Sequence, residues 1–383
     1  MDQRLNILIV DDNLIFRKFL TRVVKDIEGI ELVQPAANGR IALKRLEKDP
    51  VDLVLMDMQM PEMSGLQTLR QIRQGHPEVG VIMISGEYDA DADQVIKALE
   101  MGALDFLPKG GMDGDQNSVL ALRKHLQTLT RQYQGRKSLN LARRLAAKRS
   151  AALATGEIPA LGPSDPPAAL AEAGPAPLRS VFPGRIEVIV MGASTGGPNA
   201  LSEIIPMLPG TLNVPILLVQ HMPSFLTASL AHSLNSKSAL EVHEAKEGEV
   251  LRPGTVYVAP GGRHMMVNRT DSNGRKAPVC SITLSDDAPE NSVRPSADTL
   301  FRSVAEAYGG RVMAVILTGM GSDGMKGVSL LKKRGCYCLT QEEHTCVVYG
   351  MPRAVDEAAL SDERVPLKDM ARRITQIING SGK

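Results

Sequence analysis

Residues 51–57 read VDLVLMD and residues 186–197 read IEVIVMGASTGG. Each segment is an apolar run of strand length that ends in a loop carrying a reactive side chain. The first loop begins with the carboxylate of Asp57, and the second holds the hydroxyl of Ser194 among small residues. In a parallel α/β sheet, ligands and chemistry collect in the loops beyond the carboxyl ends of the strands. The two segments therefore predict an acidic, phosphate-accepting pocket joined to a nucleophilic site in one chain.

Around residues 51–57, the first third of the chain alternates strand and helix signals. Helical periodicity is clear where Ile15, Phe19, Val23 and Ile27 recur every fourth residue. Strand-like runs occupy residues 5–10, 31–37, 51–56, 79–84 and 103–107, and further helices are expected at 40–48, 66–74 and 91–101. Five βα units predict a flavodoxin-like, five-stranded parallel sheet covered by helices on both faces.

A second α/β unit follows residue 185. Its strand candidates are 186–190, 216–219, 256–259, 281–284, 312–317 and 336–339. We expect these strands to form a larger, mainly parallel, doubly wound sheet. The 383 residues suffice for two domains of about 150 residues and a linker.

The segment between the two units has linker composition. A helix near 118–132 closes the first unit, residues 131–150 hold seven basic and no acidic residues, and residues 151–180 are rich in Ala, Pro and Gly. The predicted domains are therefore 1–125 and 185–380, joined by the helix end and linker at 126–184. A basic run of this kind is more often solvated than bound to nucleic acid.

Composition excludes several classes of protein. No apolar run approaches the roughly 18 residues of a membrane span, and no export signal is visible, so a cytoplasmic protein is expected. The net charge of +1 and the aromatic content of 3% argue against a nucleic-acid partner. The four cysteines, Cys280, Cys336, Cys338 and Cys346, lack zinc-site spacing and are expected to be reduced thiols. We expect a monomer.

Polar side chains follow four strands of the first unit. Asp11 and Asp12 come after the first strand, Asp57 after the third, Ser85 after the fourth and Lys109 after the fifth. Clustered carboxylates repel one another unless a cation neutralises them, and Mg²⁺ prefers such oxygen ligands. This arrangement predicts a Mg²⁺ site, with Asp12 and Asp57 as ligands, beside a nucleophilic Asp57. The alternative is that acidic residues at strand ends merely begin helices.

The first unit resembles a response-regulator receiver domain. The resemblance rests on residues 57–66, DMQMPEMSGL, and residues 102–106, GALDF, together with the strand-end residues above. It implies that Asp57 accepts a phosphoryl group from a histidine kinase and that Phe106 is the aromatic switch residue.

A hydrolytic constellation is predicted in the second unit. Residues 192–196 fit G-x-S-x-G, in which small neighbours expose a serine on a strand-to-helix turn. His221 follows the next strand and Asp323 follows a later one, so that a nucleophile, a base and an orienting carboxylate share one sheet edge. The chain order Ser, His, Asp differs from the α/β-hydrolase, chymotrypsin and subtilisin orders, which indicates a separate fold. Thr195 and the backbone N–H of Met320 are candidate supports for the oxyanion.

Two alternatives concern the glycine-rich loops. A Gly/Ser loop can also cradle a phosphate. Residues 319–324 with Glu342 and Glu343 imitate a dinucleotide fingerprint, but Asp323 would place a carboxylate beside the pyrophosphate. A receiver fused to a non-catalytic binding module is therefore the competing hypothesis, and it predicts ligand binding without ester turnover.

Three further loops make the second unit resemble the chemotaxis protein-glutamate methylesterases. They span residues 258–265, 294–298 and 348–352. His264, in the first of them, is expected to have a structural role in its loop rather than to act as a second base. The resemblance implies hydrolysis of methyl esters and deamidation of glutamines on chemoreceptor helices, with no cofactor for the ester chemistry. It also implies that the unphosphorylated receiver packs across the hydrolase cleft.

Overall fold

The computed structural model describes residues 4–86, 92–109, 185–270 and 279–380, with scattered positions between 119 and 134. The described positions between 119 and 134 are helical. Apart from Tyr133 and Gln134, the predicted basic run and the Ala/Pro/Gly-rich segment lie outside these residues. The predicted domain boundaries therefore stay predictions. None of the helices among the described residues is long and apolar enough to span a bilayer.

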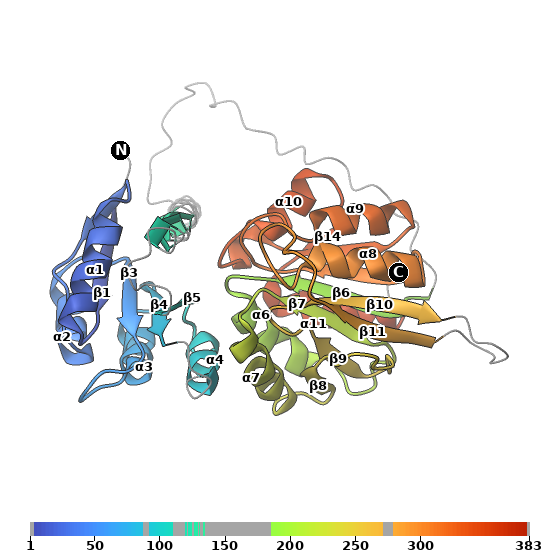
Figure 1. The fold of residues 1–383 in the computed structure, drawn as a ribbon, viewed down its shortest axis with the longest axis horizontal. Coiled ribbons are helices and arrows are strands. Elements are labelled where there is room, and N and C mark those ends of the chain that lie inside the picture. The colour runs from blue at the N-terminus through green and yellow to red at the C-terminus, as the bar shows by residue number, and fades with distance from the viewer. Residues whose placement is uncertain are drawn as a thin grey trace, which may run out of the picture.

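The first unit is the predicted five-stranded parallel sheet, with strand order β2-β1-β3-β4-β5 (Figure 1). Its elements are β1 (Leu5–Val10), α1 (Leu14–Lys25), β2 (Ile30–Leu32), α2 (Gly39–Lys48), β3 (Leu53–Asp57), α3 (Gly65–Gly75), β4 (Gly80–Ser85), α4 (Ala92–Glu100) and β5 (Asp105–Pro108). Polar side chains cap three of these helices, and Ser64 and Gln67 form a full capping box at α3. Strand β2 is shorter than the predicted 31–37, since Pro35 has no N–H to donate to a ladder.

The second unit is built on a seven-stranded parallel sheet with the order β14-β13-β12-β6-β7-β9-β8. Its strands are β6 (Val188–Ala193), β7 (Ile216–Gln220), β8 (Glu241–Glu244), β9 (Thr255–Val258), β12 (Val312–Ile316), β13 (Tyr337–Gln341) and β14 (Glu363–Val365). Its helices are α6 (Gly197–Ile204), α7 (Ser224–Asn235), α8 (Ala297–Tyr308), α9 (Met325–Lys333), α10 (Met351–Glu357) and α11 (Leu367–Ile378), with short 3₁₀ turns η2 (Ile205–Met207) and η3 (Glu343–Thr345). The doubly wound α/β prediction is confirmed.

Strand β6 lies in the middle of this sheet, and all its residues are buried. Its side chains alternate between two cores: Ile189 and Met191 pack with α6, α7 and α11, whereas Val188 and Val190 pack with α8, α9 and α10. Figure 1 shows these two groups of helices on opposite faces of the sheet. Burial on both faces explains why the strand is continuously apolar rather than alternating.

All six strands predicted in the second unit exist, but three strands were missed. Strands β8 and β14 are short, and β10 (His264–Thr270) is largely polar beyond Val267, so none of the three presents an apolar run. One predicted strand has an unexpected place. Residues 281–284 belong to β11 (Val279–Ser285), which pairs with β10 as an antiparallel hairpin outside the main sheet.

The two units pack against each other through α4 and the start of β5. The phenyl rings of Phe106 and Phe225 meet edge to face, with centroids 6.5 Å apart. Glu100 at the end of α4 accepts hydrogen bonds from Ser202 on α6 and Ser233 on α7, and pairs with Lys237 at 2.5 Å. The receiver-like unit therefore lies directly against the helices that follow the serine and histidine loops.

Candidate functional site

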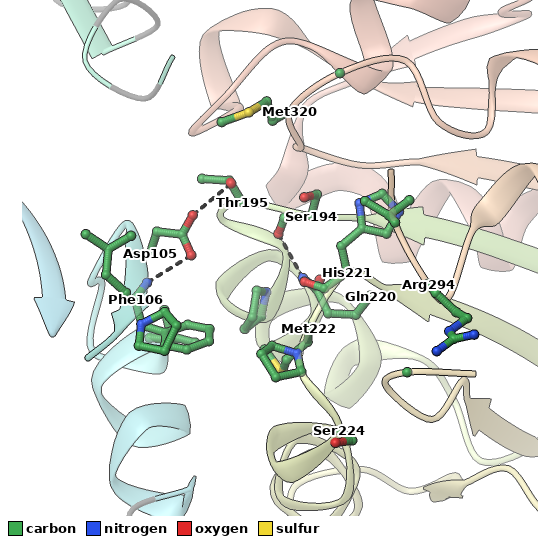
Figure 2. A pocket seen from close by; sticks show the side chains of 18 of the residues that line it. Asp105, Phe106, Ser194, Thr195, Gln220, His221, Met222, Ser224, Arg294 and Met320 are labelled. Carbon is green, nitrogen blue, oxygen red and sulfur yellow. Dashed lines mark hydrogen bonds between the residues drawn. The ribbon is translucent and has the colours of Figure 1, made fainter. Parts of the chain in front are cut away.

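Ser194 sits in a tight turn between β6 and α6. Its backbone N–H donates to the carbonyl of Thr318, at 3.1 Å, and its carbonyl accepts from Gln220 Nε2, at 2.9 Å (Figure 2). Gly196 has a φ of 77°, a left-handed conformation that favours glycine. A Cβ at Gly319 would lie 2.8 Å from the Cβ of Ser194, so the neighbouring loop must also carry a glycine. Small residues therefore allow three chain segments to converge on the serine.

His221 and Asp323 approach Ser194 from the strands on either side of β6. The backbone N–H of His221 donates to the carbonyl of Ala193, at 3.0 Å, which fixes the histidine loop against the serine loop. The imidazole Nε2 lies 2.8 Å from Asp323 Oδ2, and Figure 2 shows the ring beside Ser194. Strands β7, β6 and β12 are adjacent and parallel, so their carboxyl ends bring these three residues to one edge.

Asp323 is 3% exposed and surrounded by donors. It accepts hydrogen bonds from the Ser296 hydroxyl at 2.7 Å, the Asn291 amide at 2.9 Å and the backbone N–H of Ala297 at 2.6 Å. Burial alone would raise the pKa of this carboxyl, but the bonds from His221, Ser296 and Ala297 outweigh burial and hold the pKa well below its usual range. Asp323 is therefore ionised at neutral pH, and its negative charge faces the imidazole.

These residues open onto a cleft of about 960 Å³ between the two units. Ser194, Thr195, His221 and Met320 line one wall, and Asp105 and Phe106 at the start of β5 line the other (Figure 2). The Thr195 hydroxyl donates to Asp105 Oδ2 at 2.8 Å. One unit thus covers the constellation of the other, as the family resemblance implies.

The acidic pocket lies at the carboxyl edge of the five-stranded sheet. Oxygen atoms of Asp11, Asp12 and Asp57 lie within 4.8 Å of one another. Lys109 Nζ lies 2.7 Å from Asp57 and 3.0 Å from Asp11, and 4.9 Å from the centre of the Phe16 ring. Two buried carboxylates and an exposed one offer the oxygen ligands that Mg²⁺ prefers, with one side open to solvent.

Burial dominates the ionisation of Asp57. Desolvation raises its pKa to about 6, although Lys109 acts in the opposite direction. The pKa of Lys109 is also raised: burial lowers it, and the contacts with Asp57 and Asp11 outweigh that effect. The hydroxyl of Ser85 is buried at the end of β4 and donates to the carbonyl of Gly86, at 3.2 Å.

Three polar residues beside the serine constellation escaped the sequence interpretation. Gln220 Nε2 joins the carbonyls of Ser194 and His221, at 2.9 and 3.1 Å. Asn291 and Ser296 contact Asp323 as described above. The only sequence signals were the polar residue directly before His221 and the turn-rich loop at 294–298.

His264 is buried at the start of β10. Its Nδ1 accepts from the backbone N–H of Ser296 and its Nε2 lies 3.2 Å from the carbonyl of Ala288. Both ring nitrogens of His264 thus contact the backbone of the segment that precedes α8 and helps to hold Asp323. These contacts agree with a structural role for His264.

Comparisons with known proteins cover nearly the whole chain. Residues 189–374 match the CheB methylesterase family and residues 7–116 match the response regulator receiver domain. A protein-glutamate methylesterase/protein-glutamine glutaminase of Desulfotalea psychrophila is 38% identical over 98% of this chain and 99% of its own length. One from Saccharophagus degradans is 37% identical over 96% of this chain and 98% of its own length. The crystal structure of the Thermotoga maritima CheB methylesterase catalytic domain is 40% identical, with a TM-score of 0.47, and covers 50% of this chain and 98% of that domain.

Proposed function

Because the chain belongs to the protein-glutamate methylesterase/protein-glutamine glutaminase family and carries a response regulator receiver domain, we propose that it acts on chemoreceptors. It hydrolyses methyl esters of receptor glutamates and deamidates particular receptor glutamines, which gives adaptation in chemotaxis-type signalling. The observation that carries this proposal is the 2.8 Å contact of His221 with an ionised Asp323 beside the Ser194 turn.

Ser194 is the proposed nucleophile. Its Oγ attacks the side-chain acyl carbon of the substrate while His221 takes the hydroxyl proton, and Asp323 stabilises the resulting imidazolium. Because Nε2 of His221 contacts Asp323, the other ring nitrogen of His221, Nδ1, is the one that accepts the proton of the Ser194 hydroxyl. Backbone N–H groups of the glycine loops, including that of Met320, stabilise the oxyanion. Thr195, next to the nucleophile, supports this part of the site.

His221 gives its proton to the leaving methoxide, and methanol departs as the acyl-enzyme forms. In the second step His221 accepts a proton from the attacking water and returns it to Ser194 Oγ as the acyl bond breaks, which releases the glutamate carboxylate and restores the serine hydroxyl. The amide nitrogen is a poorer leaving group than methoxide and must be protonated before ammonia can depart, so deamidation is expected to be slower. This chemistry requires no cofactor.

Asp57 is the proposed phosphoacceptor, and a histidine kinase is the proposed phosphodonor. Asp12 and Asp57 would hold Mg²⁺, which neutralises charge between the carboxylate and the incoming phosphoryl group. Lys109 and Ser85 would contact the phosphoryl oxygens. A phosphoryl group adds about −1.5 to −2 charges, enough to shift an equilibrium between closed and open arrangements that bind it unequally.

The receiver covers the cleft in the closed arrangement, so a receptor helix needs the open one. Substrate helices lie on the cytoplasmic side of the membrane, and the enzyme is expected in the same compartment.

The test is methanol release from membranes that hold methylated receptors, with and without a small phosphodonor and Mg²⁺. Ser194→Ala is expected to lower release by at least about 10⁴-fold without changing the melting temperature, because no other side chain replaces the nucleophile. Near-normal release by this variant would refute the serine mechanism. A wild-type protein that binds receptors but releases no methanol would instead support the non-catalytic binding module.

A further inference from the structure

The amide of Asn291 joins two buried carboxylates. Its Nδ2 lies 2.9 Å from Asp323 Oδ1 and 2.9 Å from Asp298 Oδ2. An amide nitrogen carries two hydrogens, so each carboxylate receives one of them. Asp298 is fully buried in the first turn of α8, and its other oxygen accepts from the backbone N–H of Gly327 in α9, at 2.7 Å.

The bridge separates the two oxygens of Asp323 by role. Asn291, Ser296 and the backbone N–H of Asp298 all bind Oδ1, whereas Oδ2 faces His221 and the backbone N–H of Ala297. Rotation of the carboxylate would break this pattern. Donors on Oδ1 therefore keep Oδ2 directed at the imidazole.

The Asn291 bridge lies among several ionisable groups around Asp323. His221 and Asp298 face it directly, and Glu290 and Arg302 act from farther away. Arg302 is paired with Glu290 at 2.5 Å, so its charge is largely cancelled. Two carboxylates that share a buried site repel each other, and shared donors offset that repulsion.

Asparagine also suits the backbone conformation at position 291. Its φ is 53°, a left-handed conformation that asparagine adopts more readily than most residues. The residue lies in the loop between β11 and α8, and this loop lines the interdomain cleft.

We propose that Asn291 is a positioning residue for the hydrolase, whose amide holds Asp323 and Asp298 together so that Asp323 Oδ2 stays directed at His221. This inference rests on the proposed function, because it assigns Asn291 a role in the reaction of Ser194. The residue acts through Asp323 and touches neither the nucleophile nor the substrate in this role.

Two variants of the full-length protein separate this role from a structural one. Asn291→Gly keeps the left-handed backbone and removes the amide, and Asn291→Asp keeps the shape but replaces both donors with a carboxylate. Ser292→Gly is the matched control, since Ser292 is the next residue and also has a positive φ, of 65°. Methanol release is measured with phosphodonor and Mg²⁺ across pH, together with the melting temperature.

Both Asn291 variants are expected to lower kcat by about 10- to 100-fold with little change in KM, because Asp323 loses a donor but is still present. In Asn291→Asp the acid limb of kcat/KM should also move to higher pH, because an extra carboxylate favours the protonated imidazole. Ser292→Gly should retain wild-type kcat.

Unchanged kcat in Asn291→Gly, an unchanged pH profile in Asn291→Asp, or an equal loss of kcat in Ser292→Gly would each overturn the inference. Ser194→Ala distinguishes this failure from that of the proposed function. If Ser194→Ala abolishes release while Asn291→Gly does not lower it, the serine mechanism stands and only the role of Asn291 is wrong.

Discussion

At the scale of single residues, Asp57, the proposed phosphoacceptor, lowers the stability of the fold when it is ionised. It is 3% exposed, and the Lys109 ammonium only partly offsets the loss of water around its carboxylate. A group of this kind binds a proton more tightly in the folded state than in the unfolded chain. Ionisation of Asp57 therefore destabilises the metal-free receiver.

This cost predicts a pH-dependent effect of Asp57→Asn. The pKa of Asp57 rises from 3.8 to about 6 on folding, so the stability of the native protein falls as the pH rises between these values. In EDTA, Asp57→Asn should therefore stabilise the receiver by up to about 3 kcal/mol at pH 7. The gain should disappear near pH 4, where Asp57 is protonated in the folded state.

Thermal unfolding of both proteins at the two pH values measures this difference. Glu47→Gln is a control, since Glu47 is exposed on α2. An equal gain at pH 4 and pH 7 would contradict the assignment to ionisation. The same Asp57→Asn protein should show no stimulation of methanol release by a phosphodonor.

At the scale of elements, α4 and α7 form the contact that closes the cleft. Glu100 at the end of α4 meets Lys237 just beyond α7, with side-chain exposures of 16% and 42%. Because one partner is largely exposed, the pair contributes about 0.5–1 kcal/mol at most. That energy is small, but the proposed balance between closed and open arrangements would respond to it directly.

Charge reversal at this contact tests its role. Glu100→Lys should raise methanol release without phosphodonor by about two- to fivefold, because like charges at the α4–α7 contact favour the open arrangement. The double variant Glu100→Lys/Lys237→Glu should return release toward the wild-type rate. Glu47→Lys, the same charge change at an exposed position of α2, should leave the rate unchanged.

Equal basal rates in wild type and Glu100→Lys would show that this contact does not restrain the hydrolase. A higher rate that also persists in the double variant would point to the lost hydrogen bonds from Ser202 and Ser233 rather than to charge.

At the scale of the whole molecule, two chemistries are separated in space. The carboxylate cluster of Asp11, Asp12 and Asp57 lies in the receiver, whereas Ser194, His221 and Asp323 lie in the second domain. Between them lies the contact of α4 and β5 with the second domain. Phe106, the expected aromatic switch residue, lies in this interface with its ring against Phe225.

Removal of divalent metal should therefore affect stimulation by a phosphodonor and basal methanol release differently. EDTA is expected to abolish stimulation by a phosphodonor and to leave the basal rate of methanol release within about twofold, because the proposed serine mechanism requires no cofactor. Excess Mg²⁺ should restore the stimulation. A large loss of basal release in EDTA that Mg²⁺ or Zn²⁺ reverses would mean that the hydrolase centre itself uses a metal.

The sequence by itself determined both α/β units and the convergence of Ser194, His221 and Asp323. Apolar runs identify buried parallel strands, and such strands share one carboxyl edge, so residues that follow them meet without knowledge of their contacts. Short polar strands such as β8 and β14 escaped this reasoning, because their pairing partners rather than their own periodicity define them.

Only the tertiary structure decided the Asn291 bridge, the Gln220 contacts and the bond from Thr195 to Asp105. Each joins side chains from loops or domains distant in sequence, and Thr195 and Asp105 are 90 positions apart. Their meeting depends on strand order, loop conformation and domain packing, which arise from many weak long-range contacts and leave no local pattern in the chain.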